Sequence, residues 1–377
     1  FIRGEKGTEV VLTLRKKDGS IKEVKMIREE VAIEDTFARS IIVNSPNGKK
    51  YGFINLPGFN ADFEDAKGRN ASDDIKAELI KLKAQNVEGI ILDLRNNGGG
   101  SLTEVVDIMG LFMNSGPVVQ VKDGNGRVQV MRNKQNDPIW TGPLVIMQNE
   151  LSASASEILA GAMQDYGRAV IVGSPQSFGK GTVQTFVELN RFLNTSDDFG
   201  ALKLTIQKFY RVNGKSTQLK GVESDIPMKD VFSYEEIGER FDNYALPWDQ
   251  VNSSSFTVNN SINVAELAKN SQSRMAQNKF YQLLLESAQW REKLDKEEKI
   301  SLNLKEFEAV MKTRKAQIDK FKPLIKYNNG LNFALHADEL ARGKTDEVFA
   351  KKSENWMKNL KRDIFLQETV NIISELK

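Results

Sequence analysis

A short apolar run that ends in glycines constrains the fold of this chain more than any other feature. Residues 89–94, Gly-Ile-Ile-Leu-Asp-Leu, are almost continuously apolar, as is typical of a β-strand buried on both faces. The run leads into residues 96–100, Asn-Asn-Gly-Gly-Gly, and then into a predicted helix. This order of strand, glycine-rich loop and helix predicts an α/β core whose loops at the strand ends carry the chemistry.

The same order of strand, loop, helix and strand recurs through the middle of the chain. Gly52 to Leu56, Pro143 to Met147 and Ala169 to Val172 are predicted strands. Asp73 to Gln85 is a predicted helix with Ser72 as its candidate N-cap. These elements extend the predicted α/β core on both sides of the first strand.

The two ends of the chain differ from this middle part, and 377 residues suggest two or three domains. Alternating residues around the Asp18-Gly19 turn predict a β-hairpin, which is too small to be stable alone. After about residue 231, apolar residues recur at helical spacing among many Lys and Glu residues. We therefore expect residues 1–31 to end a small β domain, 32–235 to form the α/β core and 236–377 to form a helical domain of a longer precursor.

Few side chains are available for catalysis. The chain has one histidine, His336, and no cysteine, which excludes thiol nucleophiles and metal sites built on paired histidines. His336 lies far along the chain from the serine-rich run at 152–156, which disfavours a Ser-His pair. Acyl chemistry is then left to a serine whose base is a desolvated lysine. With 53 basic and 51 acidic side chains, nothing indicates a nucleic-acid or anionic-membrane partner.

Ser154 and Lys180 are the candidates for such a pair, but each motif also has a purely structural interpretation. Ser154 with Glu157 has the Ser-x-x-Glu form of a helix capping box, and on that tetrad alone capping is the favoured interpretation. The glycines at 98–100 can form a tight turn or present backbone amides to an oxyanion. Asp165 is by default a structural charge, and Gln184 by default one polar position of an alternating strand.

A phosphate-binding loop is a further interpretation of Gly179-Lys180-Gly181. The spacing from Gly173 is one residue too long, and Gly181 stands where a serine or threonine would hold magnesium. Nucleotide binding is therefore disfavoured, and we expect neither a metal nor a cofactor.

Five motifs in one order have a more specific explanation. They are Asp93 to Gly100, Ser152 to Ile158, Met163 to Ala169, Phe178 to Gln184 and a stretch from Thr205 to Ile226. In this order the chain resembles the C-terminal processing peptidases, most closely their tail-specific protease branch. The resemblance implies a core like that of the crotonases and the caseinolytic proteases, with residues 1–31 as the remnant of a PDZ domain.

The resemblance also implies an activity and residue roles. The expected protein is a serine endopeptidase with Ser154 as nucleophile, Lys180 as general base and Gln184 orienting that lysine. The amides of Ala155 and Gly99 would form the oxyanion hole. The residues expected to support the site are Glu157, Asp165, Gly98, Gly100 and Ser177.

One departure from the family pattern bears on the lysine. Between Gly173 and Gly179 the chain has one residue more than the family's usual form, and Ser177 replaces its common threonine. A loop normally absorbs such an insertion locally. The departure leaves the geometry of Lys180 to be established.

The resemblance further implies protein or peptide substrates with apolar C-termini, a possible adaptor protein and a bacterial periplasmic or cell-envelope location. Two alternatives from other classes stay open at this stage. One is an inactive peptide-binding scaffold with the same fold. The other is a crotonase-like acyl-CoA enzyme, which would not need Lys180.

Overall fold

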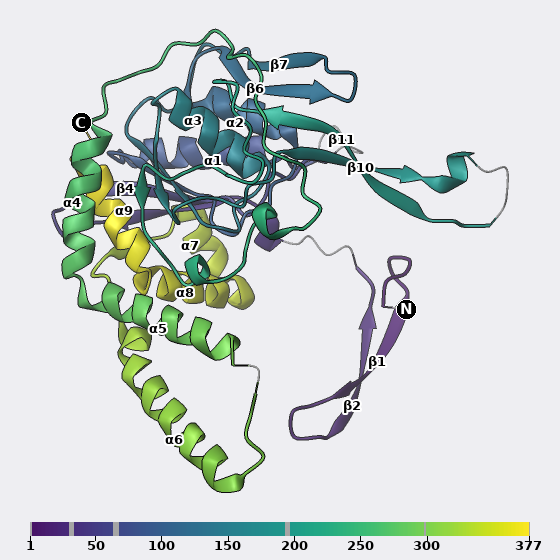
Figure 1. Cartoon of the computed structure of the whole chain (residues 1–377), viewed down its shortest axis with the longest axis vertical. Helices are drawn as coiled ribbons and strands as arrows, with labels where there is room; N and C mark the ends of the chain where they lie inside the picture. The colour runs from purple at the N-terminus through teal and green to yellow at the C-terminus, as the bar shows by residue number, and fades with distance from the viewer. Residues whose placement is uncertain (1, 30–33, 63–67, 193–196, 298, 377) are drawn as a thin grey trace. The chain divides into compact units, whose positions relative to one another are not determined.

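A computed structural model describes residues 2–29, 34–62, 68–192, 197–297 and 299–376 of the chain (Figure 1). Two compact units are distinguished, Phe1–Thr36 and Phe37–Lys377. The division lies close to the expected boundary at 31/32. Residues 37–377 form one compact unit, and the expected division of this part into a core and a helical domain stays a prediction.

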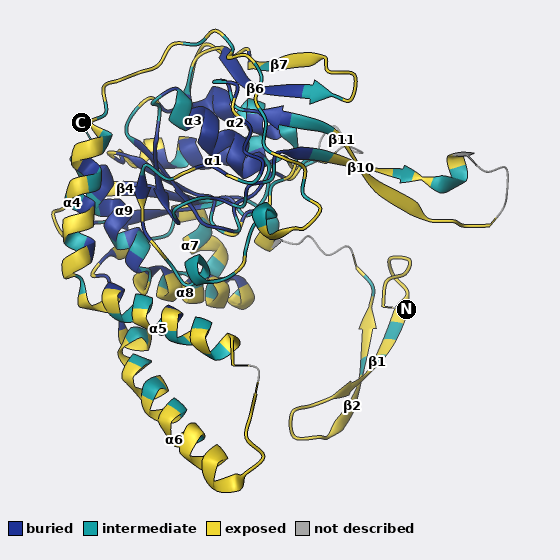
Figure 2. Cartoon of the chain, in the orientation of Figure 1, coloured by how far each residue is buried: buried dark blue, intermediate teal, exposed yellow. Residues whose placement is uncertain are grey.

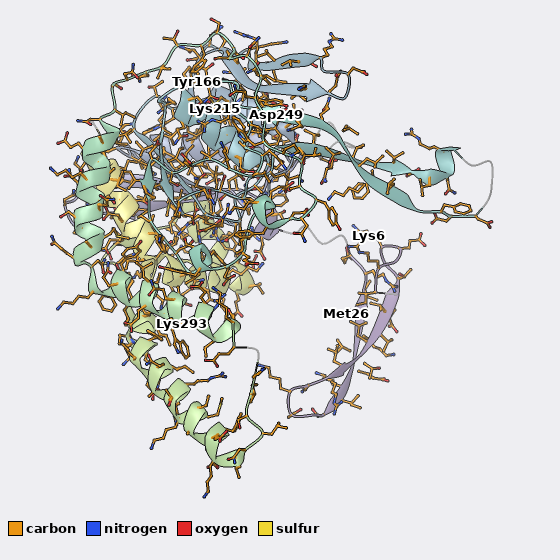
Figure 3. The ribbon with its side chains drawn as sticks, viewed as in Figure 1. Lys6, Met26, Tyr166, Lys215, Asp249 and Lys293 are labelled. Carbon is orange, nitrogen blue, oxygen red and sulfur yellow. The ribbon has the colours of Figure 1, made fainter. Side chains whose placement is uncertain are left out.

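The smaller unit is the predicted hairpin. Strands β1 (Glu9–Arg15) and β2 (Ile21–Ile27) pair antiparallel, and the Ser20 amide donates to Asp18 Oδ1 at 3.0 Å in the turn. Gly19, with φ at 83°, supplies the left-handed turn residue. Most of the hairpin is exposed (Figure 2), including Met26, which is labelled in Figure 3 and is 42% exposed. Its assignment to a PDZ domain stays a prediction.

The larger unit is organised around a seven-stranded sheet in the order β12-β9-β8-β5-β4-β3-β13. Neighbours from β12 to β4 pair parallel, whereas β3 and β13 pair antiparallel at one edge. The predicted α/β core is confirmed, and each predicted strand is found within two residues of its expected bounds. The strands are β3 (Arg39–Asn44), β4 (Lys50–Asn55), β5 (Ile90–Asp93), β8 (Leu144–Gln148), β9 (Val170–Gly173), β12 (Ile226–Pro227) and β13 (Asn332–Ala334).

Three helices cover one face of this sheet: α1 (Ala71–Ala84), α2 (Leu102–Phe112) and α3 (Ala155–Asp165). Leu92 and Ile146 of the sheet are fully buried in the core beneath them. The prediction that Ser72 caps the first helix is wrong. The helix already begins at Ala71 after Asn70, and the Ser72 amide donates to Glu104 Oε2 at 2.7 Å instead.

Residues of the C-terminal segment cover the opposite face. Side chains alternate across a strand, so Ile91 and Val145 point away from the first core and into a second one with Val370 and Ile373. Strand β13 also extends the sheet itself. The helices of this segment are α4 (Val264–Gln277), α5 (Lys279–Asp295), α6 (Leu304–Phe321), α7 (Ala337–Gly343), α8 (Glu347–Lys361) and α9 (Ile364–Glu375).

Helix α6 has the predicted apolar residues at helical spacing, but none of them is buried. Helix α6 includes Phe307, Val310 and Ile318, which are 38%, 44% and 53% exposed, and its residues are intermediate or exposed throughout (Figure 2). Among the helices that the structure describes, none is long and apolar enough to cross a membrane.

A second, four-stranded sheet has the strand order β10-β11-β6-β7. Its strand β10 begins two residues after Lys180 and pairs only with β11 in the described part of the chain. The strands are β6 (Gly116–Asp123), β7 (Val128–Asn133), β10 (Thr182–Glu188) and β11 (Ala201–Tyr210). The first strand of this sheet to follow Lys180 therefore also carries Gln184.

If the C-terminal helices share one cooperative unit with the sheet, truncating Ile373 should destabilise all of it. Ile373 is 1% exposed, so Ile373→Ala should lower the free energy of unfolding by about 2–4 kcal/mol in a single urea transition. Ile80→Ala is the matched control, because Ile80 on α1 is 53% exposed and should change little. A separate early transition in the Ile373 variant would contradict the one-unit architecture.

Candidate active site

Ser154 lies in a strained turn at the start of α3. Its backbone has φ 55° and ψ −110°, a conformation that a residue with a Cβ rarely adopts. The described residues include four non-glycine positions with positive φ, and three of them lie in or next to this site: Asn96, Ser154 and Leu219. Such strain costs about 1–3 kcal/mol per residue and clusters at functional sites. The turn therefore marks Ser154 as more than an ordinary helix cap.

The buried carboxylate of Glu157 joins the serine turn to the lysine loop. Glu157 Oε2 accepts from the Ser154 amide at 2.8 Å and from the Lys180 amide at 3.0 Å. The two amide nitrogens are therefore no farther apart than the sum of these distances. Glu157 Oε1 accepts from the Gly179 amide at 2.7 Å and from Ser177 Oγ at 2.6 Å. One fully buried side chain thus holds four donors from two loops.

The environment of Glu157 acts on its protonation in two directions. Burial, the larger effect, raises the pKa of its carboxyl group to about 7, while the hydrogen bonds from Ser177, Gly179, Ser154 and Lys180 oppose that rise. All four partners donate to the carboxyl group, which suits its ionised form. The network should therefore be sensitive to pH near neutrality.

The lysine side chain is held by the residue predicted to orient it. Lys180 Nζ donates to Gln184 Oε1 at 3.3 Å, and the Lys180 carbonyl accepts from Thr217 Oγ1 at 3.1 Å. Among the described residues, no hydrogen bond joins Lys180 Nζ to Ser154 Oγ. The structure brings the two backbones together on Glu157, but the two side chains are not hydrogen-bonded to each other in the described part of the chain.

The glycine loop after β5 lies against the serine turn. A Cβ at Gly99 would be 2.9 Å from Ser154 Cβ and 3.1 Å from the Ala155 nitrogen, and its φ of 107° also requires glycine. However, the Gly99 amide donates to Asn97 Oδ1 at 2.9 Å. The Ala155 amide, at the first position of α3, has no hydrogen bond within the described chain. Of the two predicted oxyanion donors, only Ala155 has an available amide in this arrangement.

Asn97 connects the glycine loop to the nucleophile turn and was not singled out from the sequence. This fully buried residue accepts through its carbonyl from the Ala153 amide at 3.0 Å and from Ser156 Oγ at 2.9 Å. Its side chain accepts from Gly99 and donates to the Leu56 carbonyl at 2.8 Å. Asn97 lies within the motif Asp93 to Gly100, but only the glycines that follow it were assigned a function from the sequence.

A second asparagine makes a reciprocal contact between the same two loops. Asn149 Oδ1 accepts from the Asn96 amide and Asn149 Nδ2 donates to Asn96 Oδ1, both at 2.9 Å. Ser152 Oγ adds a bond to the Leu94 carbonyl at 2.8 Å. A polar residue in a loop gives no periodic signal, so nothing in the sequence pointed to Asn149.

Of the residues predicted to support the site, Ser177 lies beside Glu157, whereas Asp165 lies far from Ser154. Ser177 is buried beside Glu157, donating to it while accepting from the Val222 amide at 2.7 Å. Asp165 lies at the opposite end of α3, about 16 Å along the helix from Ser154, where it is paired with Arg211. Asp165 therefore supports the far end of α3 and not the Ser154 turn itself.

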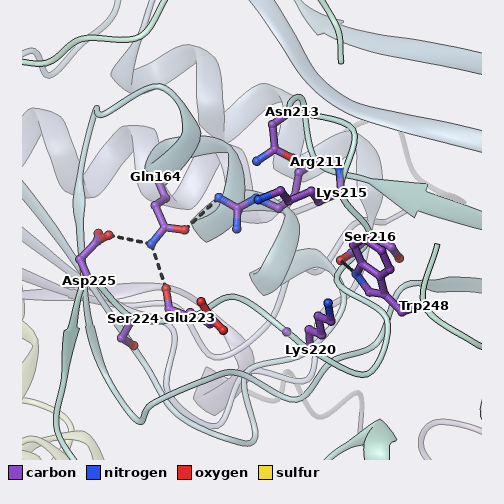
Figure 4. Close-up of a pocket in the computed structure, with 11 residues that line it drawn as sticks. Gln164, Arg211, Asn213, Lys215, Ser216, Lys220, Glu223, Ser224, Asp225 and Trp248 are labelled. Atoms are coloured by element: carbon purple, nitrogen blue, oxygen red, sulfur yellow. Dashed lines mark hydrogen bonds between the residues drawn. The ribbon is translucent and has the colours of Figure 1, made fainter. Parts of the chain in front are cut away.

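Arg211, which binds Asp165, lines a separate cavity of about 590 Å³ (Figure 4). Gln164 Oε1 accepts from Arg211 at 2.9 Å while Gln164 Nε2 donates to Asp225 at 2.8 Å, as the dashed lines in Figure 4 show. The cavity wall also includes Trp248. These contacts fix the end of α3, and neither Ser154 nor Lys180 lines this cavity.

The single histidine has a structural position. His336 is 4% exposed, and its Nε2 lies 2.8 Å from Ser40 Oγ. Ser40 Oγ also bonds to Glu78, so the imidazole takes part in a buried polar contact between β3 and α1. Its hydrogen-bond partner is thus Ser40 and not the Ser154 turn, and the described residues contain no group of three or more acidic, His or Cys side chains that could hold a metal.

Comparison with known proteins gives two family matches. Residues 50–228 match peptidase family S41, and residues 232–377 match the C-terminal domain of tail specific protease. The tail-specific protease of Haemophilus influenzae is 42% identical over 71% of this chain and 38% of its own length. A carboxyl-terminal-processing protease of Picosynechococcus is 34% identical over 55% of this chain and 46% of its own. The chain thus spans less than half of either relative.

Among solved structures, the photosystem II D1 C-terminal processing protease is similar to this chain. The two align with 26% identity and a TM-score of 0.44, covering 60% of this chain and 57% of that one.

The raised pKa of Glu157 predicts how stability depends on pH. A raised pKa means that the folded chain binds this proton more tightly than the unfolded chain, so the free energy of unfolding should fall as pH rises from 4.5 to about 7. The contribution is on the order of 3 kcal/mol. The Glu157→Gln variant has no carboxyl group at this position, so it should lack this pH-dependent contribution to the free energy of unfolding. Urea unfolding of both proteins at pH 5 and pH 8 measures the difference, and equal pH dependence in both would contradict this role.

Proposed function

Since this chain belongs to the C-terminal processing peptidases of family S41, we propose that it is a serine endopeptidase in which Ser154 attacks the peptide carbonyl and Lys180 is the base. The observation that carries the proposal is the Glu157 carboxylate, which binds the backbone amides of both residues. Their side chains therefore start from neighbouring points, and a lysine is long enough to cover the remaining distance.

Proton transfer requires a change of partner at Lys180. In the reacting form, the uncharged amine leaves or shares Gln184 Oε1 and accepts the proton of Ser154 Oγ as the hydroxyl attacks. The amine then returns this proton to the leaving nitrogen of the cleaved bond. A water molecule completes hydrolysis of the acyl-enzyme with Lys180 again as the base. Gln184, bonded to Nζ at 3.3 Å, orients the lysine in its resting position.

The negative charge of the tetrahedral intermediate needs backbone donors. We assign one to the Ala155 amide, which is available at the start of α3, where the helix also provides positive potential. The second donor would come from the loop at 98–100. Gly99 is adjacent to Ser154, but its amide has to release Asn97 Oδ1 before it can serve.

Substrate choice and location follow from the relatives. A bacterial relative named tail-specific protease supports protein substrates chosen by their C-terminal tails. That these tails are apolar, and that the protein acts in the bacterial periplasm or cell envelope, is part of the proposal. An adaptor protein would be a further partner. These assignments are proposals for the whole protein, because the chain spans less than half the length of these relatives.

An inactive peptide-binding scaffold is the second candidate. It is favoured by one observation, the Lys180 amine bonded to Gln184 rather than to Ser154. In a scaffold this arrangement would be permanent, whereas in the enzyme it is a resting position. Acylation of Ser154 separates the two.

A serine-directed acylating probe should label the wild-type chain at Ser154, and Ser154→Ala should abolish labelling. Lys180→Ala should slow labelling by about 10²–10⁴-fold because the hydroxyl loses its base. Mass spectrometry of the labelled peptide identifies the site.

Two matched substitutions of exposed residues, Ser261→Ala and Lys203→Ala, should leave the rate of labelling unchanged. Absence of labelling in the wild type would favour the scaffold. An unchanged rate of labelling in Lys180→Ala would instead favour chemistry that needs no lysine, as in an acyl-CoA enzyme.

A further inference from the structure

An arginine immediately before the glycine loop is held by two carboxylates from distant parts of the chain. Arg95 binds Asp93 with two nitrogens, at 2.8 and 2.7 Å, and binds Asp363 Oδ2 at 2.6 Å. The three side chains are 18%, 7% and 13% exposed. Asp93 ends strand β5, whereas Asp363 precedes helix α9 in the C-terminal segment. The contact therefore joins the catalytic edge of the sheet to that segment.

Asp363 uses both of its oxygens. While Oδ2 binds Arg95, Oδ1 accepts from the Phe365 and Leu366 amides at 2.9 Å and so caps α9. The buried Asn329 donates to the Asp363 carbonyl at 3.1 Å, which fixes the cap from behind. One carboxylate thus couples the first turn of α9 to the guanidinium.

The two carboxylates hold Arg95 at the wall of a cavity. A cavity of about 290 Å³ borders the triad and is lined by Arg95, Asn96 and Phe365, among others. Burial lowers the pKa of Arg95, but the charges of Asp363 and Asp93 outweigh this and raise it well above its usual value. Loss of one carboxylate would leave the guanidinium beside open space with a single partner.

The position of Arg95 continues into the serine turn through consecutive residues. The Arg95 amide donates to Asp93 Oδ1 at 3.0 Å, and the next residue, Asn96, has a left-handed φ of 63° and the reciprocal pair with Asn149. Asn97 then binds Ala153 and Ser156 on either side of the nucleophile. A shift at Arg95 would therefore reach both the oxyanion loop and the turn of Ser154.

We propose that Asp363 is a positioning residue for the peptidase, which sets the loop at 95–100 through Arg95 and makes catalysis depend on the docking of α9. The inference rests on the proposed function. It assigns the C-terminal segment a part in organising the active site. Asp363 touches neither the substrate nor the reacting atoms.

The test compares two aspartates that have the same local roles. Asp363→Asn keeps a side-chain oxygen for the cap of α9 but loses the charge that binds Arg95. Asp346→Asn is the matched control, because Asp346 caps α8 through the Phe349 amide at 2.9 Å and pairs with Arg342. Each substitution removes the charge from an N-cap that also forms an ion pair, but only Asp363 binds the arginine that precedes the glycine loop.

The measurement is the rate of Ser154 acylation by the serine-directed probe at several probe concentrations, together with the melting temperature. Asp363→Asn should lower the maximal rate about ten- to a hundredfold with little change in the half-saturating probe concentration, because misplaced catalytic groups slow the step itself. Asp363→Glu, which restores the charge, should recover part of the rate. The control variant should react like the wild type.

Each outcome has a distinct meaning. A folded Asp363→Asn chain that reacts as fast as the wild type overturns the positioning role and leaves the proposed function intact. A wild-type chain that does not react overturns the proposed function itself. If Asp363→Asn does not fold, Arg95→Lys tests the same contact from the core side, since it keeps the charge but loses the two-pronged geometry. A wild-type rate in that variant would overturn the inference, and a slowed rate in a folded chain would support it.

Discussion

The arrangement of this site depends on one buried carboxylate. Glu157 lies one turn into α3, and its two oxygens receive amides and a hydroxyl from both the serine turn and the lysine loop. Hydrogen bonds to an ionised group are stronger than neutral ones, and burial shields them from water. This carboxylate can hold Ser154 in a strained conformation that the residue would not adopt alone. Capping of the helix and placement of the proposed nucleophile are thus two results of the same contact.

The rest of the fold supplies a rigid base for that contact. The parallel strands end at one edge of the large sheet, and the loops after β5 and β8 bind one another through Asn96, Asn97 and Asn149. Cores on both faces fix the strands beneath them. Because the second core is made by C-terminal helices, the helical segment is part of what holds the active-site edge, and Asp363 gives it a polar link to the same loops.

The sequence predicted those features that are encoded locally. The apolar run at 89–94 and the alternation around the Asp18-Gly19 turn specify burial and pairing, and the corresponding strands are where they were expected. The helix boundary at Asn70 was missed because a serine two residues later offered the stronger capping signal. Contacts set by tertiary structure could not be predicted. Asp363 lies 268 residues from Arg95, and the apolar positions of α6 follow a helical period whether or not another element covers them.

The central claim is that Glu157 keeps Ser154 and Lys180 within reach of one another. A crystal structure of the chain acylated at Ser154 measures this directly. We expect Lys180 Nζ to move to about 3 Å from the acylated Ser154 Oγ or from the water that would attack the ester, while Glu157 Oε2 still accepts from both amides. An acylated structure in which Lys180 Nζ stays remote from the ester, or in which Glu157 has released either amide, would contradict it.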